Sequence, residues 1–299
     1  MSFSAGVKEE LIGMRNFTKK EEVKAECIGY LISGNITINR FTARFATESL
    51  ANVERLATLF RNLEVEDYVR KQTGKLYVVK FSKNLNIPGF DFVYENAVMS
   101  QEYKKELQTK EQLEKAIIRG VFLGSGSVNN PESNYHLEVS VGTQENAYLV
   151  ENILQKYGIE PKTLVKKNKI SIYVKDSECI SKFLALMGAT KAVLKFEDVR
   201  VVRNIKNNVN RKVNCETANL NKIVNSAVKQ LENINYIIKK DKFYKLPENL
   251  QEMAMVRIKN PDASLEELGK LLEKPISKSG VNHRLKAIEK LVQEMKEGK

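Results

Sequence analysis

The chain has 299 residues, of which 42% are hydrophobic and 29% are charged, and it carries a formal net charge of +12. This length fits two or three domains with substantial cores, and no apolar run approaches the roughly 20 residues that a membrane span needs. Three cysteines without a C-x-x-C motif and only two histidines argue against a disulfide framework, a metal site or a histidine-based triad. The N-terminus lacks an apolar signal region, so we expect a cytoplasmic protein.

The positive charge is concentrated in the C-terminal third of the chain. Residues 200–299 hold 21 Lys and Arg against 12 Asp and Glu, whereas the first 199 residues hold 28 against 25. A basic region of this kind favours a polyanionic partner. We expect nucleic acid and no membrane, because no basic amphipathic helix with bulky aromatic residues is evident there. A lysine-rich surface without such a partner is the plainer alternative.

An internal repeat organises the first two thirds of the sequence. The segment KAECIGYLISGNITI (24–38) aligns with KAIIRGVFLGSGSVN (115–129), which places Gly29 over Gly120. The apolar patterns in both copies predict the order helix–strand–strand–helix–strand–strand–helix. The strand-like segments are 44–49, 65–71, 75–81, 135–141, 162–167 and 169–175, and the later helices are 50–63, 143–158 and 177–188. Repeats of about 20–100 and 110–190 therefore predict one pseudo-symmetric α+β domain over residues 1–198.

The composition changes after this domain. Residues 200–230 hold seven basic residues, one acidic residue and eight asparagines. We interpret residues 199–216 as a basic, asparagine-rich linker that becomes helical near Glu216. Helical patterns then cover 217–239, 248–260 and 265–296, the last broken near Lys274 and Pro275. Residues 217–299 are thus predicted to form an all-α domain.

A helix-turn-helix motif is predicted at about 264–296. Ser264 and Glu267 have the S-x-x-E spacing of a capping box, which predicts the start of a short helix. Pro275 prevents that helix from continuing, and Ser277 offers the N-cap of the next. In this second helix an apolar stripe repeats at 4-3-4 spacing, namely Val281, Leu285, Ile288 and Val292.

The opposite face of this second helix carries short polar and basic side chains, which suit the major groove of DNA. The residues predicted to contact bases are Ser279, Asn282, His283, Arg284 and Lys286. The residues predicted to contact phosphates are Ser277, Lys278, Arg203, Lys206, Arg211 and Lys212. The alternatives are a solvated face on an ordinary helical hairpin and, for His283 alone, an incidental surface histidine.

The glycine-rich stretch RGVFLGSGS (119–127) admits two interpretations, a phosphate-binding loop or a helix packed through its glycines. A Walker loop requires G-x-x-x-x-G-K-[ST], and no lysine follows Gly124 or Gly126. A dinucleotide-binding loop requires a strand before the glycines, whereas here a helical pattern precedes them. The packed helix is therefore favoured, and no cofactor is expected.

A repeated helix that ends in glycine before a β-hairpin resembles the homing-endonuclease fold with its LAGLIDADG helices. IRGVFLGSG (118–126) matches the nine-letter motif, and CIGYLISGN (27–35) matches it less well. The resemblance implies that small residues let the two helices pack closely, with Gly29, Gly120 and Gly124 at that contact. The eighth letter of the motif is the metal-binding acid, and it is replaced here by Gly34 and Ser125. Because neither residue can supply a carboxylate, we expect neither catalytic residues nor a metal site.

Four further segments narrow the resemblance to the WhiA family of bacterial proteins. They are SFSAGVKEEL near the start, RGVFLGSGSVNNPESNYHLEV in the middle, NRKVNCETANLNK in the linker and SLEELGKLLEKPISKSGVNHR near the end. The fold implied is a degenerate, pseudo-symmetric two-repeat LAGLIDADG homing-endonuclease-like α+β domain followed by an all-α helix-turn-helix domain. The family implies regulation of transcription, with roles in sporulation in some bacteria and in cell division and chromosome segregation in others.

The sequence thus predicts a nucleoid-associated protein that binds double-stranded DNA in a sequence-specific manner and is not an enzyme. The N-terminal domain is left open as a site for another regulatory or division protein or as a weak DNA contact. Two rivals remain at this point. One is a protein-interaction module with secondary DNA contact, and the other is an active metal-dependent endonuclease that uses carboxylates not recognised here.

Overall fold

The computed structural model describes residues 2–94, 96–166 and 169–297. Contacts divide the chain into two compact units, Met1–Asn204 (unit 1) and Ile205–Lys299 (unit 2). The predicted end of the α+β domain at residue 198 lies close to this division. Lys167, at the end of one predicted strand, and residues 298–299, at the end of the predicted C-terminal domain, lie outside the described residues.

Unit 1 contains two copies of one arrangement, preceded by the helix α1 (Phe3–Ile12). The first copy consists of α2 (Lys20–Ile32), β1 (Ile36–Ile38), β2 (Thr42–Thr47), α3 (Leu50–Asn62), β3 (Tyr68–Thr73), β4 (Leu76–Ser82), β5 (Phe90–Val93), β6 (Asn96–Met99) and α4 (Gln101–Thr109). The second consists of α5 (Glu111–Ser125), β7 (Ser127–Val128), β8 (Leu137–Val141), α6 (Gln144–Lys156), β9 (Lys162–Lys166), β10 (Lys169–Val174) and α7 (Ser177–Met187).

The two sheets of unit 1 have the same topology, which confirms the predicted repeat. Their strand orders are β1-β2-β4-β3 and β7-β8-β10-β9, and the strand pairs are antiparallel. In β2 and β8 buried residues alternate with less buried ones, as expected for sheets with one face on the core. Ser49 and Thr143 cap the matching helices α3 and α6.

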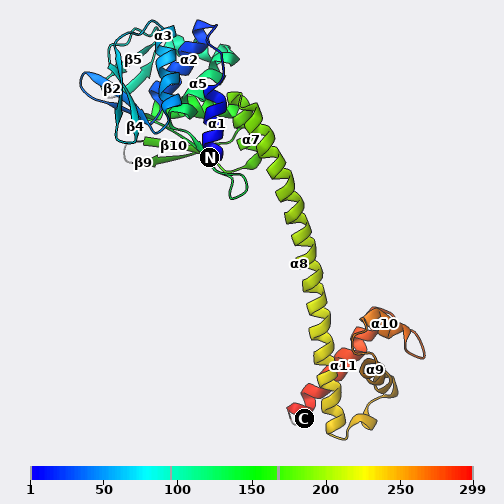
Figure 1. Ribbon diagram of the computed structural model, residues 1–299. Coiled ribbons are helices and arrows are strands. Elements are labelled where there is room, and N and C mark those ends of the chain that lie inside the picture. The colour runs from blue at the N-terminus through cyan, green and yellow to red at the C-terminus, as the bar shows by residue number, and fades with distance from the viewer. Residues whose placement is uncertain (1, 95, 167–168, 298–299) are drawn as a thin grey trace. The chain divides into compact units, whose positions relative to one another are not determined.

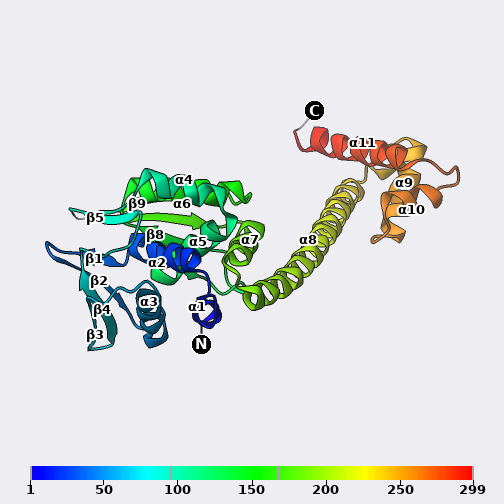
Figure 2. The ribbon, with the colours of Figure 1, turned by 90° about the horizontal axis from the view of Figure 1, so that it is seen from above.

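The helices α2 and α5 lie side by side in the centre of unit 1 (Figures 1 and 2). Most of their residues are buried, and they belong to a continuous apolar core with both sheets. The helices α1 and α4 and the separate hairpin of β5 and β6 were not predicted from the sequence. The α+β class predicted for this unit is confirmed.

The conformation predicted for residues 199–216 was wrong. This segment is helical, because α8 runs from Thr190 to Lys239 as one helix. Its asparagines are only weak helix formers, but the segment contains no glycine or proline that would end a helix. The predicted helix 217–239 is therefore the second half of a helix that begins much earlier.

Unit 2 is all-α, as predicted. The end of α8 packs with η1 (Phe243–Lys245), α9 (Glu248–Lys259), α10 (Leu265–Lys270) and α11 (Lys278–Lys296). Its core gathers one apolar face from each longer helix, including Ile237 of α8, Met253 of α9, Leu268 of α10 and Val281 of α11. Among the described residues, no helix combines the length and the apolar character that crossing a membrane would require.

Candidate nucleic-acid interface

The helix α11 has one buried face and one exposed face. Val281, Leu285, Ile288 and Val292 are all buried, as the 4-3-4 spacing predicted. Ser277 is the N-cap, and its hydroxyl accepts a hydrogen bond from the Gly280 backbone N–H at 3.3 Å. The stripe packs into the core of unit 2, whereas polar and basic side chains occupy the exposed face.

A tight turn connects α10 to α11. Ser264 and Glu267 form the predicted capping box at the start of α10. At the other end of the helix, the Ile276 backbone N–H donates to the Gly269 carbonyl at 3.1 Å. A Cβ on Gly269 would lie 2.3 Å from the Ile276 carbonyl oxygen, closer than real contacts allow. A glycine is therefore required where the chain returns against α10.

Glu252 of α9, which was not predicted from the sequence, connects the turn to α11. One carboxylate oxygen accepts a hydrogen bond from the Glu273 backbone N–H at 2.7 Å. The other lies 3.3 Å from an Arg284 guanidinium nitrogen, which also donates to the Asn249 carbonyl. Because one carboxylate binds both the turn and α11, it fixes α11 relative to α9.

Arg257, also of α9, fixes the loop before α10 through hydrogen bonds. Its side chain is buried, and its guanidinium donates to Gln230 of α8 and to the carbonyl of Ala263, which directly precedes the N-cap Ser264. A fully buried cation is rare unless its donors are satisfied, as they are here. Arg257 therefore holds the loop before α10 against α8, and its guanidinium is not available to a phosphate.

The structure places the predicted base-contacting residues in two groups. Ser279, His283 and Lys286 are exposed on α11, and Asn282 is half-buried beside them. Arg284 differs, because it is half-buried and engaged with Glu252 and the Asn249 carbonyl. Four of the five predicted residues thus share one accessible face, whereas Arg284 is oriented toward α9.

The predicted phosphate-contacting residues are distributed over both units. Ser277 and Lys278 are exposed at the start of α11, and Lys206, Arg211 and Lys212 are exposed on the part of α8 that belongs to unit 2. Arg203 belongs to unit 1. Its guanidinium lies 4.5 Å from the centre of the Tyr135 ring and donates to the Pro131 carbonyl. A phosphate at Arg203 would have to share or replace these contacts.

In unit 1, the three glycines singled out from the sequence lie where α2 meets α5. A Cβ on Gly29 would be 2.3 Å from the Ile117 carbonyl oxygen, and one on Gly120 would be 2.1 Å from the Glu26 carbonyl oxygen. A Cβ on Gly124 would be 2.4 Å from the Ser33 hydroxyl. The two helices can approach this closely only because these positions have no side chains.

A buried ion cluster lies at the same helix contact. The Glu26 carboxylate of α2 is within 2.7 Å of the Arg55 Nε of α3 and within 2.8 Å of the Arg119 Nε of α5. Burial opposes its ionisation, but the hydrogen bonds and positive charges of the two arginines outweigh burial and hold the pKa of Glu26 below its ordinary value. Arg55 also donates to backbone carbonyls at the end of α1 and beyond it, including that of Met14. The cluster therefore joins the two repeats.

The positions of the missing acids, Gly34 and Ser125, both meet Ser140 of β8. The Gly34 backbone N–H donates to the Ser140 carbonyl at 2.7 Å. The Ser125 hydroxyl donates to the same carbonyl at 2.6 Å and accepts from the Ser140 N–H at 2.9 Å. Nearby, Lys169 donates to the Asn35 side chain at 3.1 Å. Within the described ranges, no three His, Cys, Asp or Glu side chains are grouped as metal ligands.

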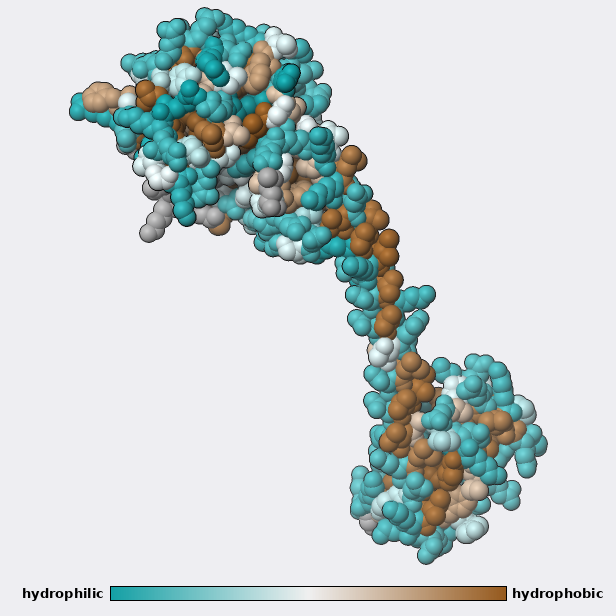
Figure 3. Space-filling view, in the orientation of Figure 1, coloured by the Kyte–Doolittle hydropathy of each residue, from teal (hydrophilic) through white to brown (hydrophobic). Residues whose placement is uncertain are grey.

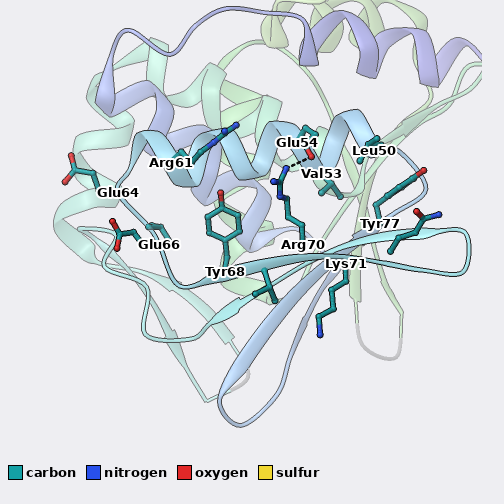
Figure 4. A pocket seen from close by; sticks show the side chains of 13 residues that line it. Leu50, Val53, Glu54, Arg61, Glu64, Glu66, Tyr68, Arg70, Lys71 and Tyr77 are labelled. Carbon is teal, nitrogen blue, oxygen red and sulfur yellow. Dashed lines mark hydrogen bonds and ion pairs between the residues drawn. The ribbon is translucent and has the colours of Figure 1, made fainter.

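A wide cavity of about 1090 Å³ lies between α3 and β3, and neither Gly34 nor Ser125 lines it. Its lining mixes apolar and charged side chains, and Arg70 and Glu54 form an ion pair across it (Figure 4). Both side chains of this pair are about half exposed, which is typical of an ordinary surface ion pair. The cavity therefore supports no assignment of a reaction.

The fold and these interfaces define a class of protein in which a LAGLIDADG-like α+β domain is joined to a helix-turn-helix domain. Residues 114–206 match the WhiA LAGLIDADG-like domain, and residues 209–292 match the WhiA C-terminal HTH domain. Over its whole length the chain is 38% identical to the "Probable cell division protein WhiA" of Desulforamulus reducens, covering 98% of that protein. It is 35% identical to the protein of the same name from Clostridium beijerinckii, with all of both chains covered.

A solved structure extends this similarity to three dimensions. The chain is similar to the crystal structure of full-length DUF199/WhiA from Thermatoga maritima, with 27% sequence identity, 98% of each chain covered and a TM-score of 0.58. Together these similarities show that the chain belongs to the WhiA family. The fold class and the family resemblance read from the sequence are thereby confirmed.

Proposed function

We propose that the protein binds double-stranded DNA in a sequence-specific manner and regulates transcription, in connection with cell division and chromosome segregation. The observation that carries the proposal is the exposed face of α11, where Ser279, Asn282, His283 and Lys286 are presented by a rigid helix-turn-helix motif. The link to cell division is supported by the names of the curated relatives, each printed as "Probable cell division protein WhiA". Such a protein acts at the nucleoid.

In this proposal the N-terminal half of α11 enters the major groove. Asn282 and Lys286 supply hydrogen bonds to adenine and guanine edges, and Ser277, Lys278, Arg211 and Lys212 bind phosphates. The phosphate contacts give affinity that falls steeply with salt, whereas the base contacts give sequence preference. Arg284 acts mainly by holding α11 against Glu252 and not as a primary base contact.

Fluorescence anisotropy with genomic fragments selected by the wild-type protein tests this assignment. Asn282→Ala combined with Lys286→Ala should lower affinity for the selected site by about 10- to 100-fold and weaken sequence preference. The matched control, Lys290→Ala with Gln293→Ala, alters exposed residues in the C-terminal half of the same helix. Equal effects of both pairs, or none from the first, would contradict the placement of α11 in the groove.

We also propose that unit 1 does not cleave DNA. The support is chemical, since Gly34 and Ser125 occupy the positions of the metal-binding acids and neither carries a carboxylate. Incubation of the purified protein with supercoiled plasmid and magnesium tests this. Plasmid that stays supercoiled at protein concentrations which shift its mobility is the expected result, and nicked or linear product would overturn the proposal.

A further inference from the structure

An apolar stripe is exposed along the part of α8 that belongs to unit 2. Its members are between 45% and 62% exposed, and they are Ile205, Val209, Val213, Leu220 and Ile223. Figure 3 shows that hydrophobic side chains, coloured brown, gather along α8. The spacing from Val209 onward is 4, 7 and 3, which is the heptad spacing of a helix that packs against another helix. A contiguous exposed apolar surface of this kind marks an interaction site.

The same face of α8 is a packing face further along the helix. Ala227, Ile234 and Ile237 continue the heptad spacing, and all three are buried, the two isoleucines in the core of unit 2. The stripe is thus the uncovered part of a surface that elsewhere packs against helices. A second helix laid on it would extend the same kind of contact.

The charges of this segment are sorted by face. At about 100° per residue, Arg211 and Lys222 lie more than about 140° from Val209, on the far side of the helix. Only three charged residues lie within about 60° of Val209, namely Lys206, Lys212 and Glu216. Two of these residues are basic and Glu216 is acidic. The stripe of one copy can therefore form ion pairs with the stripe of another copy.

We propose that the stripe binds a second copy of the chain. The two copies of α8 would run antiparallel, and the midpoint of their contact along each helix would lie at the level of residue 211. In this register Val209 of each copy faces Val213 of the other, and Lys206 of each copy faces Glu216 of the other. Leu220 then meets Val202, which is also exposed and also on α8. Two ion pairs flank the central valines, and apolar pairs enclose them on both sides.

The charges select the antiparallel arrangement over the parallel one. In a parallel pair with the helices in register, Lys206 would face Lys206 and Glu216 would face Glu216 within the apolar seam. Like charges in such positions disfavour a register, and opposite charges specify it. The antiparallel contact turns both repulsions into attractions. It assigns Lys206 to the interface between copies, in place of the phosphate contact predicted from the sequence.

The measurement is the oligomeric state of the full-length protein without DNA, by sedimentation equilibrium over a wide concentration range. The wild-type protein should form dimers. Lys206→Glu and Glu216→Lys should each weaken dimerisation about tenfold or more, because each creates two like-charge pairs. The double variant Lys206→Glu/Glu216→Lys restores both pairs with reversed polarity, so it should dimerise like the wild type.

Arg211→Glu is the matched control, because it makes the same change of charge as Lys206→Glu on the opposite face of α8. It should leave the dimerisation constant unchanged. Far-ultraviolet circular dichroism confirms that each variant retains its helices. A wild-type protein that stays monomeric overturns the inference, as does a double variant that dimerises no better than the single ones. DNA binding is measured separately, so failure here leaves the proposed function intact.

Discussion

Gly29 and Gly120 meet backbone to backbone at the centre of unit 1. A Cβ placed on Gly120 would lie 2.9 Å from the Gly29 Cα and 2.1 Å from the Glu26 carbonyl oxygen. Neither atom belongs to a flexible side chain that could move aside. The two repeats are therefore held at a separation that only glycine permits.

Gly120→Ala should destabilise unit 1, because the two helices would have to move apart within a packed core. Overpacking of this kind costs about 1–3 kcal/mol, and the backbone contact places this variant at the upper end of that range. Urea denaturation of the full chain, followed by circular dichroism, gives the free energy of unfolding. Gly6→Ala is the control, since a Cβ there meets nothing within 4 Å, and this variant should be neutral or stabilising.

Glu26→Gln should lower stability at neutral pH by about 3 kcal/mol, because it leaves two buried arginines without their counter-charge. The pKa of Glu26 is lowered in the folded state, so its contribution is complete above pH 4.5, the ordinary value, and is lost as the pH falls further. The difference between wild type and variant should therefore shrink below about pH 4.5. Urea titrations at several pH values test this.

The control for Glu26 is Glu64→Gln, which breaks the exposed pair with Lys20. An exposed ion pair contributes about 0–1 kcal/mol, so this variant should change little at any pH. A constant gap between wild type and Glu26→Gln from neutral to acid pH would show that the carboxylate is not the source of the stabilisation.

Gly269→Ala should disturb the turn between α10 and α11. A Cβ at this position would collide with the Ile276 carbonyl oxygen, so the turn must open and α11 must shift. We expect lower DNA affinity together with a lower melting temperature for unit 2. In Gly280→Ala the nearest atom is 3.2 Å away at the end of the Ile276 side chain, which can move, so binding should be largely kept. Similar losses in both variants would argue against this explanation.

Arg284→Ala and Glu252→Ala should both weaken DNA binding, because each removes the ion pair that holds α11 against α9. Each variant should lower affinity several-fold while the preferred sequence stays the same, and the double variant should add little more. Binding-site selection with each protein reveals the preference. A change of preferred base caused by Arg284→Ala alone would instead support the direct base contact predicted from the sequence.

The repeat and the helix-turn-helix motif were predictable because their signals are local. Alternating apolar residues marked the strands, and Ser264 with Glu267 marked the start of α10 by the spacing of a capping box. The continuity of α8 was not predicted, because asparagines suggest a loop by composition and only the absence of glycine and proline argues otherwise.

The supporting contacts of the candidate site were harder to predict. Glu252 and Arg257 look like ordinary surface charges of an amphipathic helix, and only the packing of α9 turns them toward α11 and α8. A better signal existed for the buried cluster of unit 1. Glu26 and Arg119 each interrupt an otherwise apolar run, and a charge in such a place predicts a buried partner.

Ser140 contacts both positions, 34 and 125, that align with the metal-binding acid of the LAGLIDADG motif. Its carbonyl accepts from both Gly34 and Ser125, and a Cβ at position 34 would lie 2.4 Å from its hydroxyl. A carboxylate at position 125 cannot donate a hydrogen bond, so it would face that carbonyl with like partial charge. An acidic side chain at either position would therefore disrupt the contacts with Ser140. Introducing metal chemistry into this scaffold would therefore require changes at Ser140 as well as new acids.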